Sequence, residues 1–113
     1  MIDWSAFNMY LKSFGQEMTL KLIDMFIADY PANISKLKMI VEARDFSQLQ
    51  ALAHNLKSNC ALFGGTEAAD CALKLEMMGK EQVNDQMDEV FARFLVASED
   101  LVRELRTYRS TLS

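Results

Sequence analysis

Hydrophobic residues recur every three or four positions along most of the chain, which is the spacing of one face of an α-helix. The pattern predicts five helical segments. The first starts at Asp3, the second carries Leu20 and Ile23, and the other three begin near Ser47, Thr66 and Asp85. The last segment is the longest and runs to about residue 108. No stretch of useful length alternates between apolar and polar residues as a half-buried strand does. The chain is therefore predicted to be helical throughout.

Glycine and proline indicate where the segments end. Gly15, the pair Gly64–Gly65, and Gly79 each follow a periodic segment, and glycine is common just past the C-terminus of a helix. Pro31 falls inside the second segment. Since proline has no amide hydrogen to donate, we expect the helix to end, bend or restart there.

Capping residues indicate where helices start. Asp3 is a good N-cap for the first segment. Ser47 and Gln50 have the spacing of a capping box, in which each side chain bonds the other residue's amide. Thr66 is expected to cap the fourth segment. Amphipathic helices joined by short turns favour an antiparallel bundle. We predict an all-α fold, an antiparallel four-helix bundle with a short N-terminal lid helix, in which residues 1–113 form one domain.

Composition and charge narrow the function classes. Half of the residues are hydrophobic and 25% are charged, which is ordinary for a folded globular domain. The net charge is −4 and no run of basic residues occurs, which argues against a nucleic-acid-binding protein. The N-terminus lacks the pattern of a signal peptide, and the longest charge-free run, residues 46–56, is too short to span a bilayer. Two cysteines without zinc-site spacing fit a reducing cytoplasm, where we place the protein.

The single histidine, His54, lies one position past the apolar stripe of the third segment. Residues three, four and seven positions away share its side of a helix, and these are Gln50, Lys57, Ser58 and Ala61. We therefore expect the imidazole to face solvent, with a cation one turn away and little bulk beyond it.

Such a surface suits phosphoryl chemistry. A neutral imidazole nitrogen is a nucleophile near neutral pH, and Lys57 is placed to stabilise phosphoryl oxygens as a point charge. Ser58 and Ala61 leave room for another protein to approach His54. Spacing alone also allows the alternative that His54 is incidental, on the solvated face of a structural or adaptor bundle.

The run AHNLKSNCALFGG at residues 53–65 resembles the signature of the histidine-containing phosphotransfer (HPt) family. That signature has histidine, any residue, leucine, lysine and a small residue, with a glycine six positions after the small one. The resemblance continues through Cys71 and the pair Leu75–Glu76, and it is close over residues 46–76. One position differs from the family signature: Ser58 stands where the family most often has glycine.

The resemblance implies a four-helix bundle in which His54 accepts a phosphoryl group from the aspartate of a receiver domain and passes it to another receiver. The partners it implies are response regulators or a hybrid sensor kinase, and the chain itself is expected to be a monomer without a kinase or phosphatase apparatus. Magnesium would be held by the receiver, so no cofactor and no metal ligand are assigned here. Lys57 is assigned to phosphoryl stabilisation, and Gln50, Ser58 and Ala61 to partner docking.

Two enzyme classes fit the sequence poorly. A sensor histidine kinase needs a nucleotide-binding domain with a glycine-rich phosphate loop, and this chain has none. Such a kinase also has an acidic residue directly after the histidine, where Asn55 stands here. A di-iron bundle needs Glu-x-x-His motifs, and Ala51 occupies the position of the glutamate.

Overall fold

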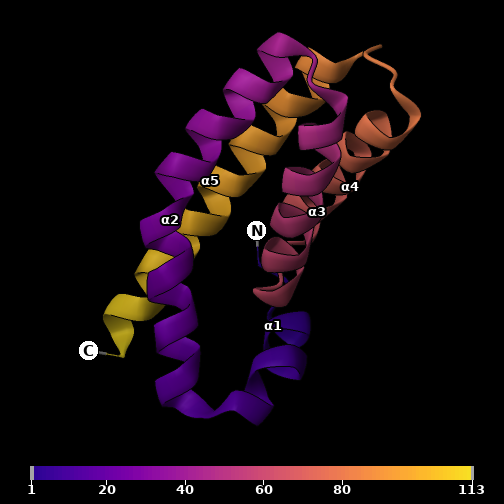
Figure 1. The fold of residues 1–113 in the computed structure, drawn as a ribbon. Helices are drawn as coiled ribbons and strands as arrows, with labels where there is room; N and C mark the ends of the chain where they lie inside the picture. The colour runs from indigo at the N-terminus through magenta and orange to yellow at the C-terminus, as the bar shows by residue number, and fades with distance from the viewer. Residues whose placement is uncertain (1, 113) are drawn as a thin grey trace.

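The computed structural model describes residues 2–112, and most of these residues are helical (Figure 1). Within that range there is no strand. The elements are α1 (Trp4–Leu11), a 3-10 turn (Lys12–Phe14), α2 (Gly15–Ala43), α3 (Phe46–Leu62), α4 (Thr66–Glu81) and α5 (Met87–Thr111).

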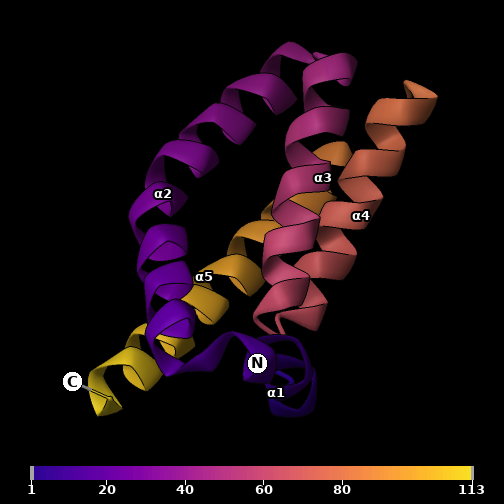
Figure 2. The same ribbon diagram turned by 60° about the horizontal axis from the view of Figure 1, so that its bottom comes forward.

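The long helices α2 to α5 run alternately up and down, so that neighbours along the chain are antiparallel (Figures 1 and 2). Helix α2 contacts both α3 and α5, and α4 also contacts both α3 and α5. The contact between α3 and α4 is the most extensive of all. Short helix α1 crosses one end of this arrangement (Figure 2). The predicted all-α bundle with an N-terminal lid helix is confirmed.

All four long helices contribute fully buried side chains to one core. Each large apolar side chain removed from water stabilises the fold by roughly 1.5–3 kcal/mol before the entropy of ordering is counted. The largest of them are Ile23 and Leu37 of α2, Leu49 and Leu56 of α3, Leu75 of α4, and Met87, Phe94, Leu101 and Leu105 of α5.

Helix α2 continues through Pro31 instead of ending or restarting there. The proline is exposed to solvent, and the helix curves along its length (Figure 2). Bending was one of the outcomes predicted for a proline inside a helix. Helix α2 ends at Ala43, and Arg44 adopts the left-handed conformation (φ 53°) in the short connection to α3.

Two of the predicted N-caps are wrong. Helix α3 begins one residue earlier than expected, because the side chain of Asp45 accepts a hydrogen bond from the amide of Gln48. Ser47 is therefore inside the first turn. Helix α4 begins at Thr66, but its cap position is Gly65, which has no side chain to offer. Asp3 does cap α1, where it accepts from the amides of the second and third helical residues.

The predicted end of α4 at Gly79 is also wrong. The helix runs on to Glu81, and Gln82 takes the left-handed conformation (φ 58°) that ends it. Gly79 is buried inside the helix, where it faces the first turn of α3. A glycine at a helix crossing and a glycine at a helix end look the same in one sequence, so the pattern could not separate them.

The lid helix is fixed to the bundle at two points. The amide of Asp3 donates a hydrogen bond of 2.7 Å to the carbonyl of Gly64, in the turn between α3 and α4. The rings of Trp4 and Phe7 pack against Tyr108 of α5, with centroids 5.4 and 5.1 Å away. Helix α1 thereby covers the apolar end of the bundle.

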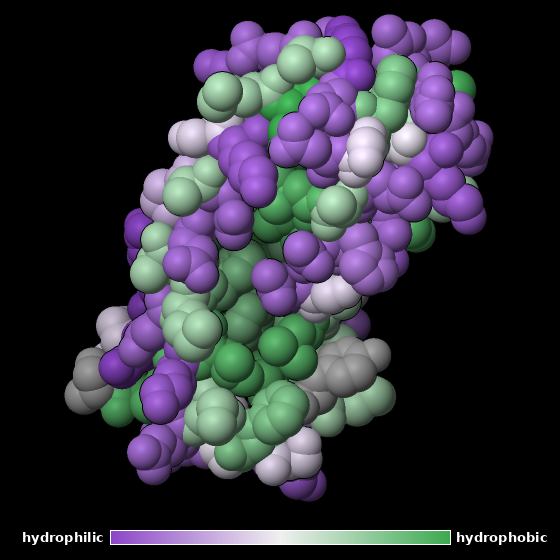
Figure 3. All heavy atoms as spheres, viewed as in Figure 1, coloured by the Kyte–Doolittle hydropathy of each residue, from purple (hydrophilic) through white to green (hydrophobic). Residues whose placement is uncertain are grey.

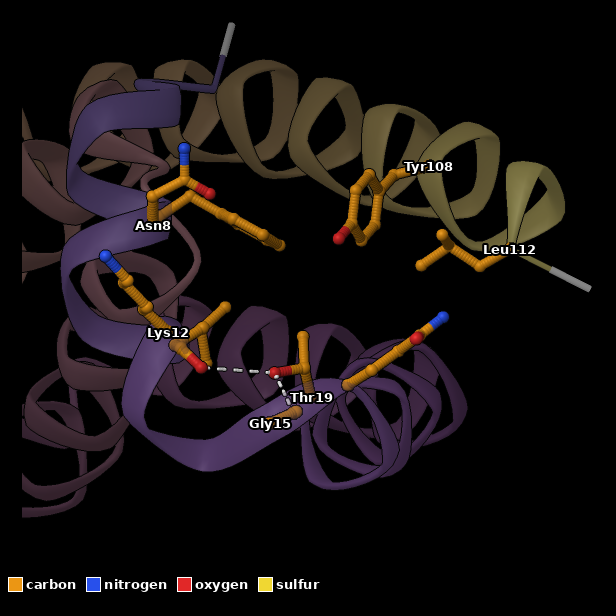
Figure 4. A pocket seen from close by; sticks show the side chains of 9 residues that line it. Asn8, Lys12, Gly15, Thr19, Tyr108 and Leu112 are labelled. Carbon is orange, nitrogen blue, oxygen red and sulfur yellow. Dashed lines mark hydrogen bonds between the residues drawn. The ribbon is translucent and has the colours of Figure 1, made fainter.

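A pocket of about 350 Å³ opens beside the lid. Asn8 and Lys12 face Tyr108 and Leu112 across it (Figure 4). On its floor the hydroxyl of Thr19 donates a hydrogen bond of 2.8 Å to the carbonyl of Gly15. The lining includes none of the residues that the sequence singled out for chemistry.

Candidate functional site

His54 lies near the middle of α3, on its solvent side. Its neighbours Ala53 and Leu56 are buried in the core, and this fixes the rotation of the helix. The imidazole therefore points outward, with 57% of the side chain exposed. The solvent-facing orientation predicted from the spacing is confirmed.

One ring nitrogen of His54 is occupied by a carboxylate from the next helix. Nδ1 of His54 lies 2.8 Å from Oε2 of Glu76 on α4. An ionised carboxylate can only accept a hydrogen bond, so Nδ1 must carry the proton. In the neutral ring the lone pair then resides on the other nitrogen, Nε2, which is the one left free to react.

Lys57 also binds Glu76. Its Nζ lies 2.9 Å from Oε1 of the carboxylate, while His54 holds Oε2. The sequence placed Lys57 near the imidazole but did not identify its partner. The two oxygens of Glu76 thus join the cation and the imidazole into one cluster, which we call the His–Glu–Lys cluster (His54, Glu76 and Lys57).

The electrostatics of the cluster favour an ionised Glu76. The hydrogen bond and positive charge of Lys57 are the main cause that lowers the pKa of the Glu76 carboxyl, and the bond from His54 lowers it further. Partial burial opposes this effect. Because the lowering effects win, the ionised form of Glu76 is favoured, and this is the form that accepts the hydrogen of Nδ1.

The side chains expected to meet a partner lie on either side of His54. Gln50 is half-buried and lines an open hollow of about 450 Å³ together with Ser47, Ala51, His54, Asn55 and Glu76. Ala61 is half-buried. The hydroxyl of Ser58 donates to the main-chain carbonyl of His54, at 3.2 Å. This hydroxyl is therefore engaged by the helix backbone.

An apolar depression continues the surface beyond Ser58. Figure 3 shows hydrophobic surface in the hollow between α2 and α3. The depression has a volume of about 130 Å³, and it includes Leu62, four residues after Ser58 on the same side of α3. Its lining consists of Leu22, Met25, Phe26, Asp29, Asn33, Asn59, Leu62 and Phe63.

Glu76 is the site residue that the sequence reasoning missed. It appeared only as half of the Leu75–Glu76 pair that resembles the family. A signal was present, since Leu75 is a core position and Glu76 follows it by one residue, which places the carboxylate at the edge of the buried face. Which helix it would face, however, depends on how α4 packs against α3. Local periodicity does not contain that information.

The cysteines do not supply a second nucleophile. Both are free and buried. Burial raises the pKa of the Cys60 thiol to about 12, and it also raises the pKa of Cys71. A thiol in this state is a small apolar side chain at neutral pH.

Between residues 2 and 112, no three side chains of His, Cys, Asp or Glu are grouped so that they could hold a metal ion.

Comparison with known families adds one finding. The family model described as the Hpt domain matches residues 21–108, which cover most of α2 and all of α3, α4 and nearly all of α5. The match includes the whole His–Glu–Lys cluster and omits α1. Comparisons with curated proteins and with solved structures gave no significant match.

None of the helices in the described part of the chain has the length and apolar character needed to cross a membrane.

Proposed function

The chain belongs to the Hpt domain family, and from this premise we propose that it carries a phosphoryl group on His54 between the receiver domains of response regulators. The observation that carries the proposal is the hydrogen bond of 2.8 Å from Nδ1 of the exposed His54 to Glu76. It leaves Nε2 unprotonated and turned to solvent, where a second protein can reach it.

The transfer step follows from that tautomer. The lone pair of Nε2 attacks the phosphorus of an aspartyl phosphate on the receiver, and an N–P bond forms. The P–O bond to the aspartate breaks, and the aspartate leaves as a carboxylate with the bonding electrons. The proton on Nδ1 stays in place, so the ring becomes a phosphorylated imidazolium. The reverse sequence delivers the phosphoryl group to another receiver.

Glu76 stabilises the charge that this step creates. The ring gains positive charge as the N–P bond forms, and the carboxylate accepts the Nδ1 hydrogen on the opposite side of the ring. Hydrogen bonds between charged partners are roughly twice as strong as neutral ones. The same division of labour occurs wherever a carboxylate orients a catalytic imidazole and compensates its charge. Glu76 therefore acts through His54 as a positioning residue and does not touch the phosphoryl group.

We assign Lys57 two successive partners. Before transfer its ammonium is bound to Oε1 of Glu76, at 2.9 Å, and keeps the carboxylate ionised. After transfer the new phosphoryl oxygens, one helical turn away, compete for the same ammonium. Its four-carbon stem is flexible enough to serve either group. Lys57 thus binds the Glu76 carboxylate before the ring is phosphorylated and the phosphoryl oxygens afterwards.

Docking is expected on the low surface around His54. Gln50 lies on one side of the imidazole, and Ser58 and Ala61 lie on the other. A receiver that covers Ser58 next meets the apolar depression between α2 and α3, which offers buried contact area.

The receiver supplies the magnesium ion in this proposal. The chain works as a monomeric phosphocarrier, and its partners include hybrid sensor kinases that contain receivers. We place this exchange in the cytoplasm.

A labelling experiment tests the proposal. The chain is incubated with radiolabelled phosphoramidate, and separately with a phosphorylated receiver domain. We expect a label that is lost in acid and kept in alkali, as a phosphoramidate bond is. His54→Gln should lose the label and keep its helical circular dichroism. Full labelling of His54→Gln, or an acid-stable label, would show that the chain is a bundle of another function or is modified elsewhere.

A further inference from the structure

Gly79 of α4 lies close against the main chain at the start of α3. A Cβ built at Gly79 would lie 2.6 Å from the amide nitrogen of Gln50 and 2.7 Å from the carbonyl oxygen of Phe46. It would also lie 3.0 Å from Cα of Gln50. Carbon atoms in contact normally stay about 3.5–4.0 Å apart. Any other residue at position 79 must therefore push the two helices apart.

The obstacle at Gly79 is main chain, which cannot turn aside. Gly65 offers a contrast, because a Cβ added there would first meet the Cδ2 end of the Leu101 side chain. At Gly15 a Cβ would meet nothing within 4 Å. A glycine inside a helix also costs about 1 kcal/mol relative to alanine. Position 79 thus carries a helix-weakening residue at a point where a side chain would collide with the main chain of α3.

This contact lies one helical turn from the His–Glu–Lys cluster. Glu76 precedes Gly79 by three residues, which is about 4.5 Å along α4. His54 follows Gln50 by four residues, which is about 6 Å along α3. Because the two helices are antiparallel (Figure 1), both steps lead in the same direction. The separation fixed at Gly79 is therefore the separation across which Glu76 reaches His54.

We propose that Gly79 is a positioning residue for His54. By letting the main chain of α4 come against α3, it holds the carboxylate of Glu76 2.8 Å from Nδ1 and so keeps Nε2 as the free nitrogen. The Glu76 side chain is only 16% exposed, so its surroundings restrict how far it can follow a displaced helix. The inference rests on the proposed role of His54 as the phosphoacceptor.

The tautomer of His54 is the direct readout, and it requires no phosphate. Nitrogen-15 NMR of the full chain, at a pH where the ring is neutral, distinguishes Nδ1–H from Nε2–H. We expect Nδ1–H to dominate in the wild type. In Gly79→Ala the ratio of Nδ1–H to Nε2–H should fall roughly tenfold, because losing a hydrogen bond to a charged group shifts an equilibrium by about a factor of ten. In a Glu76→Gln background, Gly79→Ala should change the ratio no further.

A control separates positioning from general strain. Ala68 is buried in the first turn of α4, roughly 16 Å along the helix from Gly79. Ala68→Val should strain the core and lower the melting temperature, yet it should leave the tautomer ratio at the wild-type value. An equal shift in Ala68→Val, or an unchanged ratio in folded Gly79→Ala, would overturn the proposal.

A second variant covers the case in which Gly79→Ala does not fold. Glu76→Asp withdraws the carboxylate by one methylene while Gly79 and the helix packing stay intact. We expect it to lower the tautomer ratio, and an unchanged ratio would show that reach is not limiting and would overturn the proposal. If the ratio depends on Gly79 but phosphoramidate does not label His54, the positioning role stands and the phosphocarrier function fails.

Discussion

The α3–α4 pair and the α2–α5 pair hold the bundle together in different ways. Between α3 and α4 the contact is extensive and the main chains come together at Gly79. Between α2 and α5 the contact is smaller and uses side chains. Tyr30 and Ser98 share a hydrogen bond of 2.7 Å there, and Nε of Arg109 donates to Oδ1 of Asp24 at 3.0 Å.

This difference between the two helix pairs suggests that different residues determine the stability of the bundle and the reactivity of His54. Side chains that bridge two helices can adjust when one helix moves, so the α2–α5 pair tolerates small shifts. In the proposed mechanism the His–Glu–Lys cluster acts through one hydrogen bond, which keeps the proton on Nδ1 of His54. We propose that this bond needs a fixed helix separation and that the main-chain contact at Gly79 supplies it. We therefore expect core changes to alter stability and changes in the cluster to alter chemistry.

The largest expected effect on stability is in the core. Phe94 of α5 is completely buried, and Phe94→Ala should lower the free energy of unfolding by about 3–5 kcal/mol through lost burial and a cavity. Chemical denaturation measures this. Val96→Ala, at an exposed position of the same helix, should change it by less than about 0.5 kcal/mol. If the folded Phe94→Ala fraction had an altered His54 tautomer, the proposed separation would be wrong.

After His54 itself, Glu76 is expected to matter most for the chemistry. In Glu76→Gln the shape remains but the negative charge that compensates the imidazolium is lost. Phosphoryl transfer should slow by a factor of roughly ten or more, since hydrogen bonds to charged groups are worth about 1.5–3 kcal/mol. Rapid-quench kinetics measure the rate, and Glu81→Gln at the exposed end of α4 serves as the control. Equal rates for both variants would remove Glu76 from the mechanism.

A smaller effect is expected for Lys57. Lys57→Ala should slow transfer only several-fold, because a partly exposed charged contact contributes about 1 kcal/mol or less. It should also raise the pKa of Glu76 toward its ordinary value of 4.5, because Lys57 is the main cause that lowers it. Carbon-13 NMR of the Glu76 carboxyl during an acid titration tests this, with Lys80→Ala as the control. An unmoved Glu76 pKa would contradict the ion pair.

The lowered pKa of Glu76 also makes the free energy of unfolding depend on pH, in a direction that follows from the shift. The pKa of Glu76 is lowered in the folded state, so around that pKa the folded chain binds fewer protons than the unfolded chain. The resulting stability is present above the ordinary carboxyl pKa and is lost as the pH falls through the lowered one. Wild type and Lys57→Ala should therefore differ most in stability near neutral pH and converge in strong acid.

The sequence predicted local features well and contacts between helices poorly. Apolar spacing was enough to place His54 on the solvent side of α3, because burial of Ala53 and Leu56 fixes the rotation of a helix. It could not show that Glu76 faces His54, since that depends on packing between residues 22 positions apart. Gly79 illustrates the same limit. Its role comes from the main chain of α3, and a glycine-terminated helix was the simpler interpretation of one sequence.

The nitrogen of His54 that forms the N–P bond can be identified by NMR. The nitrogen-15-labelled chain is phosphorylated with phosphoramidate, and phosphorus–nitrogen couplings then identify the nitrogen that carries the phosphoryl group. Because Glu76 holds the hydrogen on Nδ1, we expect phosphorylation of His54 at Nε2. A phosphoryl group on Nδ1 of His54, or on any other residue, would contradict it.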